Sequence, residues 1–103
     1  MFKLIFFVPK LNAESVKSSI FKTGAGKLGN YSHCSFEMSG TGQFKPLQGS
    51  NPTIGQVDKI EKVDELRIEI LCSPDNIDQA IAALKSSHPY EEPAYEVYKL
   101  EKY

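Results

Sequence analysis

The sequence has few cysteines, little net charge and no long apolar run. Its 103 residues include two cysteines, Cys34 and Cys72, which are too few for a disulfide scaffold and form no C-x-x-C pair. The net charge of −1 excludes the basic footprint of a protein that binds nucleic acid or an anionic membrane. The run from Leu4 to Pro9 is too short to span a bilayer. Lys3 alone supplies the positive charge that a signal peptide needs before its apolar segment, so we do not expect a signal peptide. We therefore expect a cytoplasmic protein without nucleic-acid or membrane partners.

The length and composition suit one compact domain covering residues 1–103, and the order of predicted strands and helices indicates an α+β fold. Hydrophobic residues make up 41% and charged residues 24% of the chain, as in ordinary globular proteins. Residues Phe2 to Val8 are apolar on both faces, which predicts a central strand covered on both sides. Asn12 is a suitable N-cap, and the spacing of Ala13, Val16 and Ile20 predicts a helix over 13–23.

The remaining elements complete a ferredoxin-like order. They are an alternating strand over 31–38, a hairpin turn at Gly40-Thr41-Gly42, a strand over 62–72, a helix that begins at Pro74, and a closing strand over 94–100. The order β-α-β-β-α-β, with an extra hairpin between the halves, predicts a sandwich with both helices on one face of the sheet. Ile5, Phe7 and Leu71 would lie on the other face and are too apolar for bulk water. We therefore expect a homo-oligomer, with a trimer preferred.

The segment from His88 to Pro93 is the strongest candidate for a site. It places an imidazole, a phenol and two carboxylates (His88, Tyr90, Glu91 and Glu92) on a loop stiffened by two prolines. Proline and the residue before it disfavour the helical conformation, so the helix should end at Ser87-His88-Pro89. A loop that is costly to order often carries binding residues.

Residues 24–29 match the phosphate-binding motif G-x-G-x-x-G in sequence but not in its position between a strand and a helix. A phosphate-binding loop of this type follows a strand, whereas these residues follow a predicted helix. A tight helix-to-strand connection that needs positive φ explains the glycines better.

The two histidines raise the question of a divalent metal. His33 and Glu37 share a strand face, and His88 lies close in sequence to Glu91, so His33, His88 and Glu91 could ligate one zinc, iron or copper ion. This hypothesis requires the two imidazoles to meet in space. Structural histidines without a metal are the alternative.

Two sequence blocks carry a family resemblance. The first joins Gly24-Ala25-Gly26, Gly29-Asn30-Tyr31 and Cys34-Ser35-Phe36 to the spaced residues Gly40, Gly42, Phe44, Pro46, Gly49, Pro52 and Gly55, and the second runs from His88 to Tyr95. Together they resemble the domain inserted into bacterial Nif-three-like (NGG-interacting factor three-like) proteins, over essentially the whole chain. The chain is similar, more distantly, to CutA-like divalent-cation-tolerance proteins and PII signalling proteins. Those relatives are ferredoxin-like trimers.

The resemblance implies a regulatory module rather than a known reaction. Long Nif-three-like proteins hold a dinuclear metal centre in a core that flanks the insert, and this sequence looks like the insert alone. We expect a non-enzymatic module that senses a small ligand or metal or docks on a partner protein. Its candidate site joins His88, Tyr90, Glu91 and Glu92 with Asn30, Tyr31 and His33. The alternative is a small metal-assisted hydrolase that uses His33, His88 and a glutamate.

Overall fold

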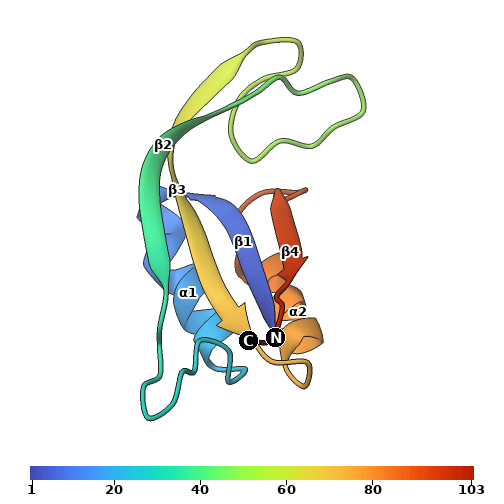
Figure 1. Cartoon of the computed structure of the whole chain (residues 1–103). Coiled ribbons are helices and arrows are strands. Elements are labelled where there is room, and N and C mark those ends of the chain that lie inside the picture. The colour runs from blue at the N-terminus through green and yellow to red at the C-terminus, as the bar shows by residue number, and fades with distance from the viewer.

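Four strands form one antiparallel sheet, and both helices pack on the same face of it (Figure 1). The computed structural model describes residues 1–103. Its elements are β1 (Phe2–Pro9), the 3-10 turn η1 (Lys10–Asn12), α1 (Ala13–Phe21), β2 (Phe36–Phe44), β3 (Glu61–Cys72), α2 (Ile77–Ser87) and β4 (Tyr95–Lys99). The strand order is β2-β3-β1-β4. This is the ferredoxin-like α+β sandwich that the sequence predicts. None of the helices is long and apolar enough to cross a membrane.

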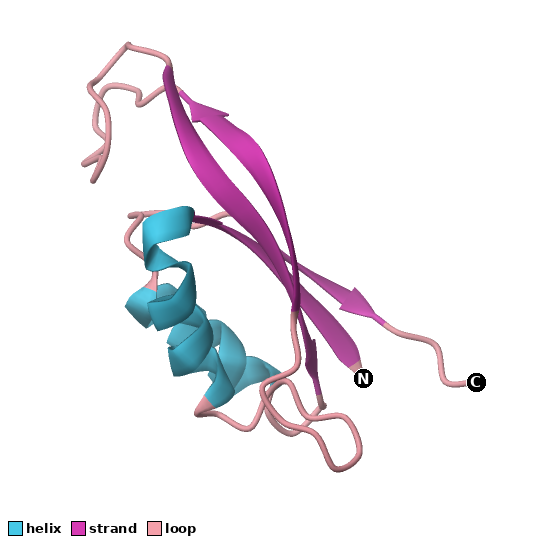
Figure 2. Ribbon diagram, turned by 90° about the vertical axis from the view of Figure 1, so that its left-hand side faces the viewer, coloured by secondary structure: helices cyan, strands magenta, loops and turns pink.

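The core lies between the sheet and the helices, as the side view shows (Figure 2). Alternate residues of β1 and β3 point toward the helices, because successive side chains of a strand face opposite sides. One apolar stripe of each helix meets them, at the spacing of i, i+3 and i+4. The fully buried members are Leu4, Phe6, Val8, Val16, Ile20, Ile68, Ala80 and Leu84.

Strands β2 and β3 are longer than the rest of the sheet and project beyond it. The pairing of β3 with β1 ends at Glu65, whereas its pairing with β2 continues to Glu61. Loop 45–60 joins the projecting ends and bends back toward the top of β4 (Figure 1). The predicted turn at Gly40-Thr41-Gly42 is therefore wrong, because these residues lie inside β2. The hairpin between the two halves is the β2–β3 pair itself.

The connector between α1 and β2 is longer than predicted. Residues 31–35 are not strand, and β2 begins only at Phe36. The glycines of the connector have positive φ, including Gly26 at 80°, which confirms a tight connection between a helix and a strand. A Cβ at Gly26 would lie 2.7 Å from the Phe21 ring, so only glycine fits this close packing. The phosphate-binding interpretation has no support here.

The second helix ends where the prolines require. His88 caps α2 in an extended conformation, with φ −70° and ψ 138°, as expected for a residue that precedes Pro89. At the other end, Pro74 belongs to a turn, and the first α-helical residue is Ile77. The side chain of Asn76 accepts a hydrogen bond from Ser73 N and closes this turn at 2.9 Å.

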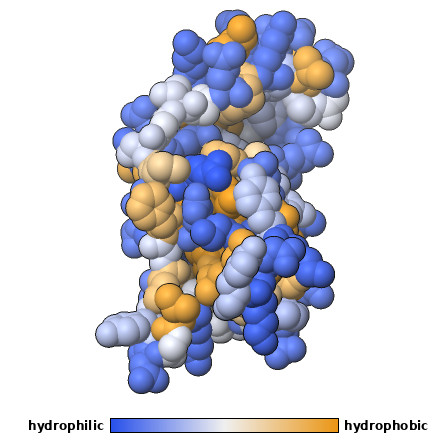
Figure 3. Space-filling view, in the orientation of Figure 1, coloured by the Kyte–Doolittle hydropathy of each residue, from blue (hydrophilic) through white to orange (hydrophobic).

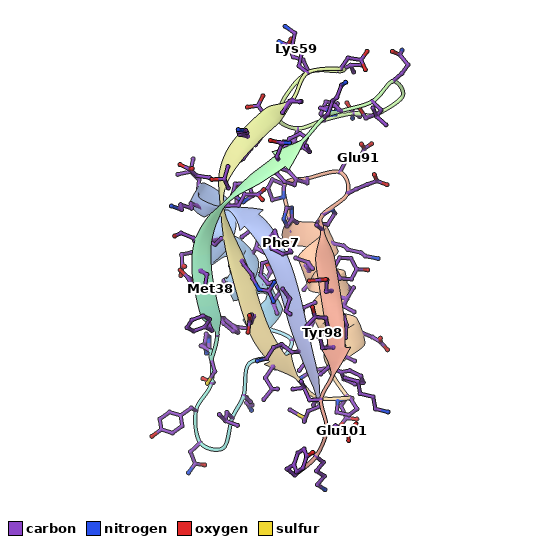
Figure 4. All side chains as sticks on the ribbon, turned by 45° about the horizontal axis from the view of Figure 1, so that its top comes forward. Phe7, Met38, Lys59, Glu91, Tyr98 and Glu101 are labelled. Carbon is purple, nitrogen blue, oxygen red and sulfur yellow. The ribbon has the colours of Figure 1, made fainter.

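The face of the sheet opposite the helices has no cover within the chain. Phe7, Met38 and Tyr98 point outward from it in Figure 4. Phe36, Met38 and Tyr98 are 61%, 46% and 47% exposed, but Ile5 is only 1% exposed because its own neighbours cover it. Figure 3 shows that apolar and hydrophilic side chains alternate on this face instead of forming one continuous patch. The expectation that Ile5 needs a second subunit to cover it is therefore wrong.

Candidate functional site

A pocket of about 480 Å³ lies at the end of β1, under the projecting β2–β3 hairpin. Its walls come from four segments that are far apart in the sequence: Phe7 of β1, the end of β2 with loop 45–60, Glu65 of β3, and residues 90–94. Six of its lining residues are apolar, namely Phe7, Phe44, Pro46, Pro52, Ile54 and Ala94. Its acidic side chains are Glu65, Glu91 and Glu92. The size is typical of a site for a small molecule.

A buried histidine holds the floor of the pocket. The Nδ1 atom of His88 accepts a hydrogen bond from the backbone N–H of Tyr90 at 3.1 Å. The Nε2 atom therefore carries the ring hydrogen and donates it to the carbonyl oxygen of Phe7 at 2.6 Å. His88 is only 6% exposed, and this burial lowers its pKa, against the opposing effects of the Phe7 carbonyl and the Glu65 charge. His88 is thus a neutral structural residue with both nitrogens occupied.

Tyr90 and Glu65 form the polar wall of the pocket. The hydroxyl of Tyr90 donates to Oε2 of Glu65 at 2.8 Å, and burial together with this carboxylate raises the pKa of Tyr90. The edge of the Tyr90 ring packs on Phe44, with 5.7 Å between the ring centroids. The other oxygen of Glu65 lies against Gly42, where any Cβ would overlap it. Glycine at position 42 therefore makes room for the carboxylate.

Loop 45–60 is held over the pocket by bonds to the segment after α2. The backbone N–H of Asn51 donates to Oε1 of Glu91 at 3.1 Å, and the hydroxyl of Thr53 donates to the carbonyl oxygen of Pro89 at 2.7 Å. These two bonds connect the far end of the hairpin to the body of the domain. The roof of the pocket therefore forms within one chain, without a second subunit.

The structure divides the predicted site residues between two ends of the sheet. Tyr90, Glu91 and Glu92 line the pocket, and His88 supports it from below. Asn30, Tyr31 and His33 belong to the connector at the opposite end, where they are exposed to solvent. His33 lies there against Phe21 of α1, with 4.9 Å between the ring centroids.

Strand register gives the separation of the two groups. The connector bonds to β3 through Gly26 N and the carbonyl oxygen of Leu71, whose partner on β1 is Lys3. His88 bonds instead to Phe7. At about 3.3 Å per residue, these points of β1 are roughly 13 Å apart. The connector residues Asn30, Tyr31 and His33 therefore do not line this pocket, and the predicted joint site does not form within one chain.

The predicted metal site of His33, His88 and Glu91 does not form within one chain, for the same reason. The two imidazoles lie at opposite ends of the sheet, and both nitrogens of His88 already make hydrogen bonds. No group of three His, Cys, Asp or Glu side chains in the chain could hold one ion. The alternative of a hydrolase with His33, His88 and a glutamate around one metal fails within one chain.

Sequence reasoning missed Phe7, Gly42, Phe44 and Glu65 as pocket residues. Each lies on a strand and has a common structural explanation, so none carries a local signal of binding. Gly42 offered the only clue, because a glycine inside a strand often marks the close approach of another group.

The comparisons with known proteins agree with this architecture. No family model matches the chain. The chain is 45% identical over 100 residues to a GTP cyclohydrolase 1 type 2 homolog of Halalkalibacterium halodurans, and the match covers 97% of this chain and 27% of that relative. A Bacillus cereus protein related to NIF3 has a similar structure, with a TM-score of 0.83 and 40% identity over 98% of this chain and 26% of that one. The relatives of this chain are thus GTP cyclohydrolase 1 type 2 homologs and proteins related to NIF3.

The chain spans about a quarter of the length of those relatives. The fold is also that of CutA from Xylella fastidiosa, which superimposes with a TM-score of 0.70 at 18% identity, over 98% of this chain and 84% of that one. At that identity the likeness shows the fold alone. Both resemblances noted from the sequence, to the NIF3-like segment and to CutA, are confirmed.

Replacing Gly42 with alanine tests the contact with Glu65. We expect Gly42→Ala to lower the free energy of unfolding by about 1–3 kcal/mol, because the added Cβ displaces a carboxylate that Tyr90 holds. Gly40→Ala is the matched control: it lies in the same strand with no atom within 4 Å of the new Cβ, so its effect should stay within about 0.5 kcal/mol. Chemical denaturation measures both, and equal effects of the two variants would contradict the assignment.

The lowered pKa of His88 makes stability depend on pH. Above the ordinary histidine pKa of 6.5 the ring is neutral in both states. As the pH falls below that value, His88 becomes protonated in the unfolded chain but stays neutral in the folded chain. The free energy of unfolding therefore falls until the pH passes below the pKa of His88 in the folded state. We expect His88→Gln to flatten this acid-side slope in denaturation curves between about pH 7.5 and 5, and His33→Gln, at an exposed position, to retain it. An unchanged slope in His88→Gln would contradict the buried neutral state.

Proposed function

We propose that this protein is a non-enzymatic ligand-binding module of the NIF3-like type, with a regulatory role carried by the pocket under the β2–β3 hairpin. The observation that supports this most is a pocket of about 480 Å³ that is already formed in the chain alone. Pre-formed concave sites with mostly apolar walls and a few fixed polar groups are typical of small-molecule binding. The cytoplasm remains the expected compartment.

A regulatory role is supported by where the pocket lies. Its two sides, loop 45–60 and residues 90–94, touch each other through the bonds of Asn51 and Thr53 to the segment after α2. A ligand that contacts both sides favours the arrangement in which they are close, because a ligand shifts an equilibrium by its differential affinity for the two states. Occupation of the pocket thus controls how firmly the projecting hairpin is held.

The name of the relatives does not supply a reaction for this chain. The GTP cyclohydrolase 1 type 2 homologs are about four times longer, and the chain corresponds to about a quarter of their length. A fold and a family name do not imply activity without a site, and function is argued from the residues present. The residues at the pocket support binding better than catalysis.

We further propose that the module is a homo-oligomer, with a trimer preferred, in which the bare face of the sheet meets other copies. Phe36, Met38 and Tyr98 are exposed on this face. The same face carries charges of both signs, such as Lys3 and Glu69 in an ion pair of 3.4 Å. A surface with both signs and scattered apolar side chains can be complementary to its own copy, as a homo-oligomer requires.

Thermal stability in the presence of a broad panel of metabolites, nucleotides and divalent cations tests the binding function. A true ligand at one hundred times its Kd adds about 2.7 kcal/mol and raises Tm. Ala94→Phe should abolish this shift, because Ala94 lines the pocket and the larger ring fills it. Ala82→Phe, at an exposed position of α2, is the control and should retain the shift. A shift that survives Ala94→Phe would place the ligand elsewhere, and no shift with any compound would remove the support for small-molecule sensing.

The solution mass tests the assembly. We expect light scattering to give three times the mass of one chain, and Met38→Glu to reduce it, because a carboxylate would be buried in the apolar contact. Leu11→Glu, at a position that is 99% exposed on η1, should leave the mass unchanged. A wild-type protein with the mass of a single chain would contradict the proposal.

A further inference from the structure

We propose that the ligand of this pocket is a small organic cation, namely an amine or quaternary ammonium group on an apolar body. This inference rests on the proposed binding function and adds the chemical class of the ligand. It follows from three features of the pocket, which are its charge, the state of Glu65 and its aromatic walls.

The charge of the pocket is of one sign. Glu65, Glu91 and Glu92 line it, whereas none of its lining residues is Lys, Arg or His. None of these glutamates belongs to an ion pair of the molecule. Glu91 is seen beside the end of β4, on the side of the overhanging loop (Figure 4). A cation is attracted to such a pocket, and phosphates or carboxylates are repelled from it.

Glu65 is a buried carboxylate whose partner within the chain is neutral. It is 9% exposed, and its Oε2 accepts the hydroxyl of Tyr90 at 2.8 Å. Its Oε1 makes no hydrogen bond within the chain and borders the pocket at the Cβ-free side of Gly42. Because no buried side-chain oxygen of the molecule lacks a partner, this unpartnered oxygen is accessible, and a cationic group from outside the chain can pair with it there.

Arg67, the basic side chain two residues after Glu65 on β3, is engaged elsewhere. Arg67 donates from Nε to Oε2 of Glu69 at 3.2 Å, and its guanidinium lies 5.9 Å from the centroid of the Phe7 ring. It therefore does not neutralise Glu65. The pocket side of this carboxylate remains available to a ligand.

The apolar lining suits the body of an organic cation rather than a bare metal ion. The rings of Phe7, Phe44 and Tyr90 line the same space, and Ile54 and Pro52 contribute from loop 45–60. Aromatic faces attract ammonium groups through their quadrupole and also bury the attached apolar groups. A hydrated metal ion would instead need several oxygen ligands around it, and the pocket does not converge in that way.

Three probes that share one phenyl ring separate the effect of charge from that of shape. We would titrate the full chain, labelled with ¹⁵N, with phenethylammonium, 2-phenylethanol and phenylacetate, and follow the amide signals of Gly42, Tyr90 and Glu91. We expect phenethylammonium to shift these signals and to bind at least about ten times more tightly than the alcohol, because a charge-assisted hydrogen bond contributes an effect of that order. Phenylacetate should cause no shift at the pocket.

Matched glutamine variants test the role of the carboxylate. Glu65→Gln keeps an oxygen that can accept the hydrogen bond from Tyr90 but removes the charge. It should weaken the binding of phenethylammonium about tenfold or more and leave the binding of the alcohol unchanged. Glu92→Gln should weaken the binding of phenethylammonium less than Glu65→Gln does. Because Glu92 is exposed, this variant should keep the fold. Glu96→Gln removes the same charge from an exposed position of β4, outside the pocket and outside the ion pairs, and is the control, with no effect expected.

The outcomes separate this inference from the binding function. If the alcohol or phenylacetate binds the pocket as well as the amine, the cation class is wrong, although the pocket still binds small molecules. If none of the probes shifts the pocket signals and the broad panel gives no stabilisation, both proposals are wrong. If Glu65→Gln lowers the solution mass, a basic side chain of a second copy occupies the pocket, and the inference of a free small molecule is overturned.

Discussion

The buried imidazole of His88 is the interaction on which the upper part of the domain depends. Its two nitrogens bond the end of β1, through the Phe7 carbonyl, to the backbone of Tyr90 after α2. Tyr90 continues the connection to Glu65 of β3, where the pairing with β1 ends. Because each group is largely removed from water, each bond is strong and each missing partner would be costly. The floor and one wall of the pocket are thus fixed by a single series of hydrogen bonds.

The projecting hairpin follows from the same few residues. Beyond Glu65, β3 has no partner on the side of β1, and only its pairing with β2 continues. An isolated two-stranded ribbon is marginal in water, so its far end needs additional contacts. Loop 45–60 supplies them through Asn51 and Thr53, which bond to the segment after α2. The overhang is held at both ends, and the space it encloses is the pocket.

The fold could be predicted from periodicity, whereas much of the site could not. The helical spacing of Ala13, Val16 and Ile20 and the central place of β1 in the sheet follow from neighbours in the sequence, and both predictions are confirmed. The cover expected on the second face of β1 is not supplied within the chain. His33 and His88 looked equivalent, because each lies near a glutamate in the sequence. Their positions at opposite ends of the sheet depend on strand order, which local spacing does not contain. Gly42 looked like a turn residue because the carboxylate that it accommodates comes from another strand.

The chemistry of the pocket follows from burial rather than from any motif. A glutamate on an exposed strand would indicate no particular function. Here the neutral hydroxyl of Tyr90 donates to one oxygen of Glu65, and Gly42 and the aromatic rings of the pocket border the other side. Removing a carboxylate from water without a counter-charge lowers stability, so selection for stability alone would favour an apolar residue at this position. Within the proposed function, a cation would supply the counter-charge that this carboxylate lacks within the chain. A ligand with such a differential affinity would shift the equilibrium toward the arrangement that it binds.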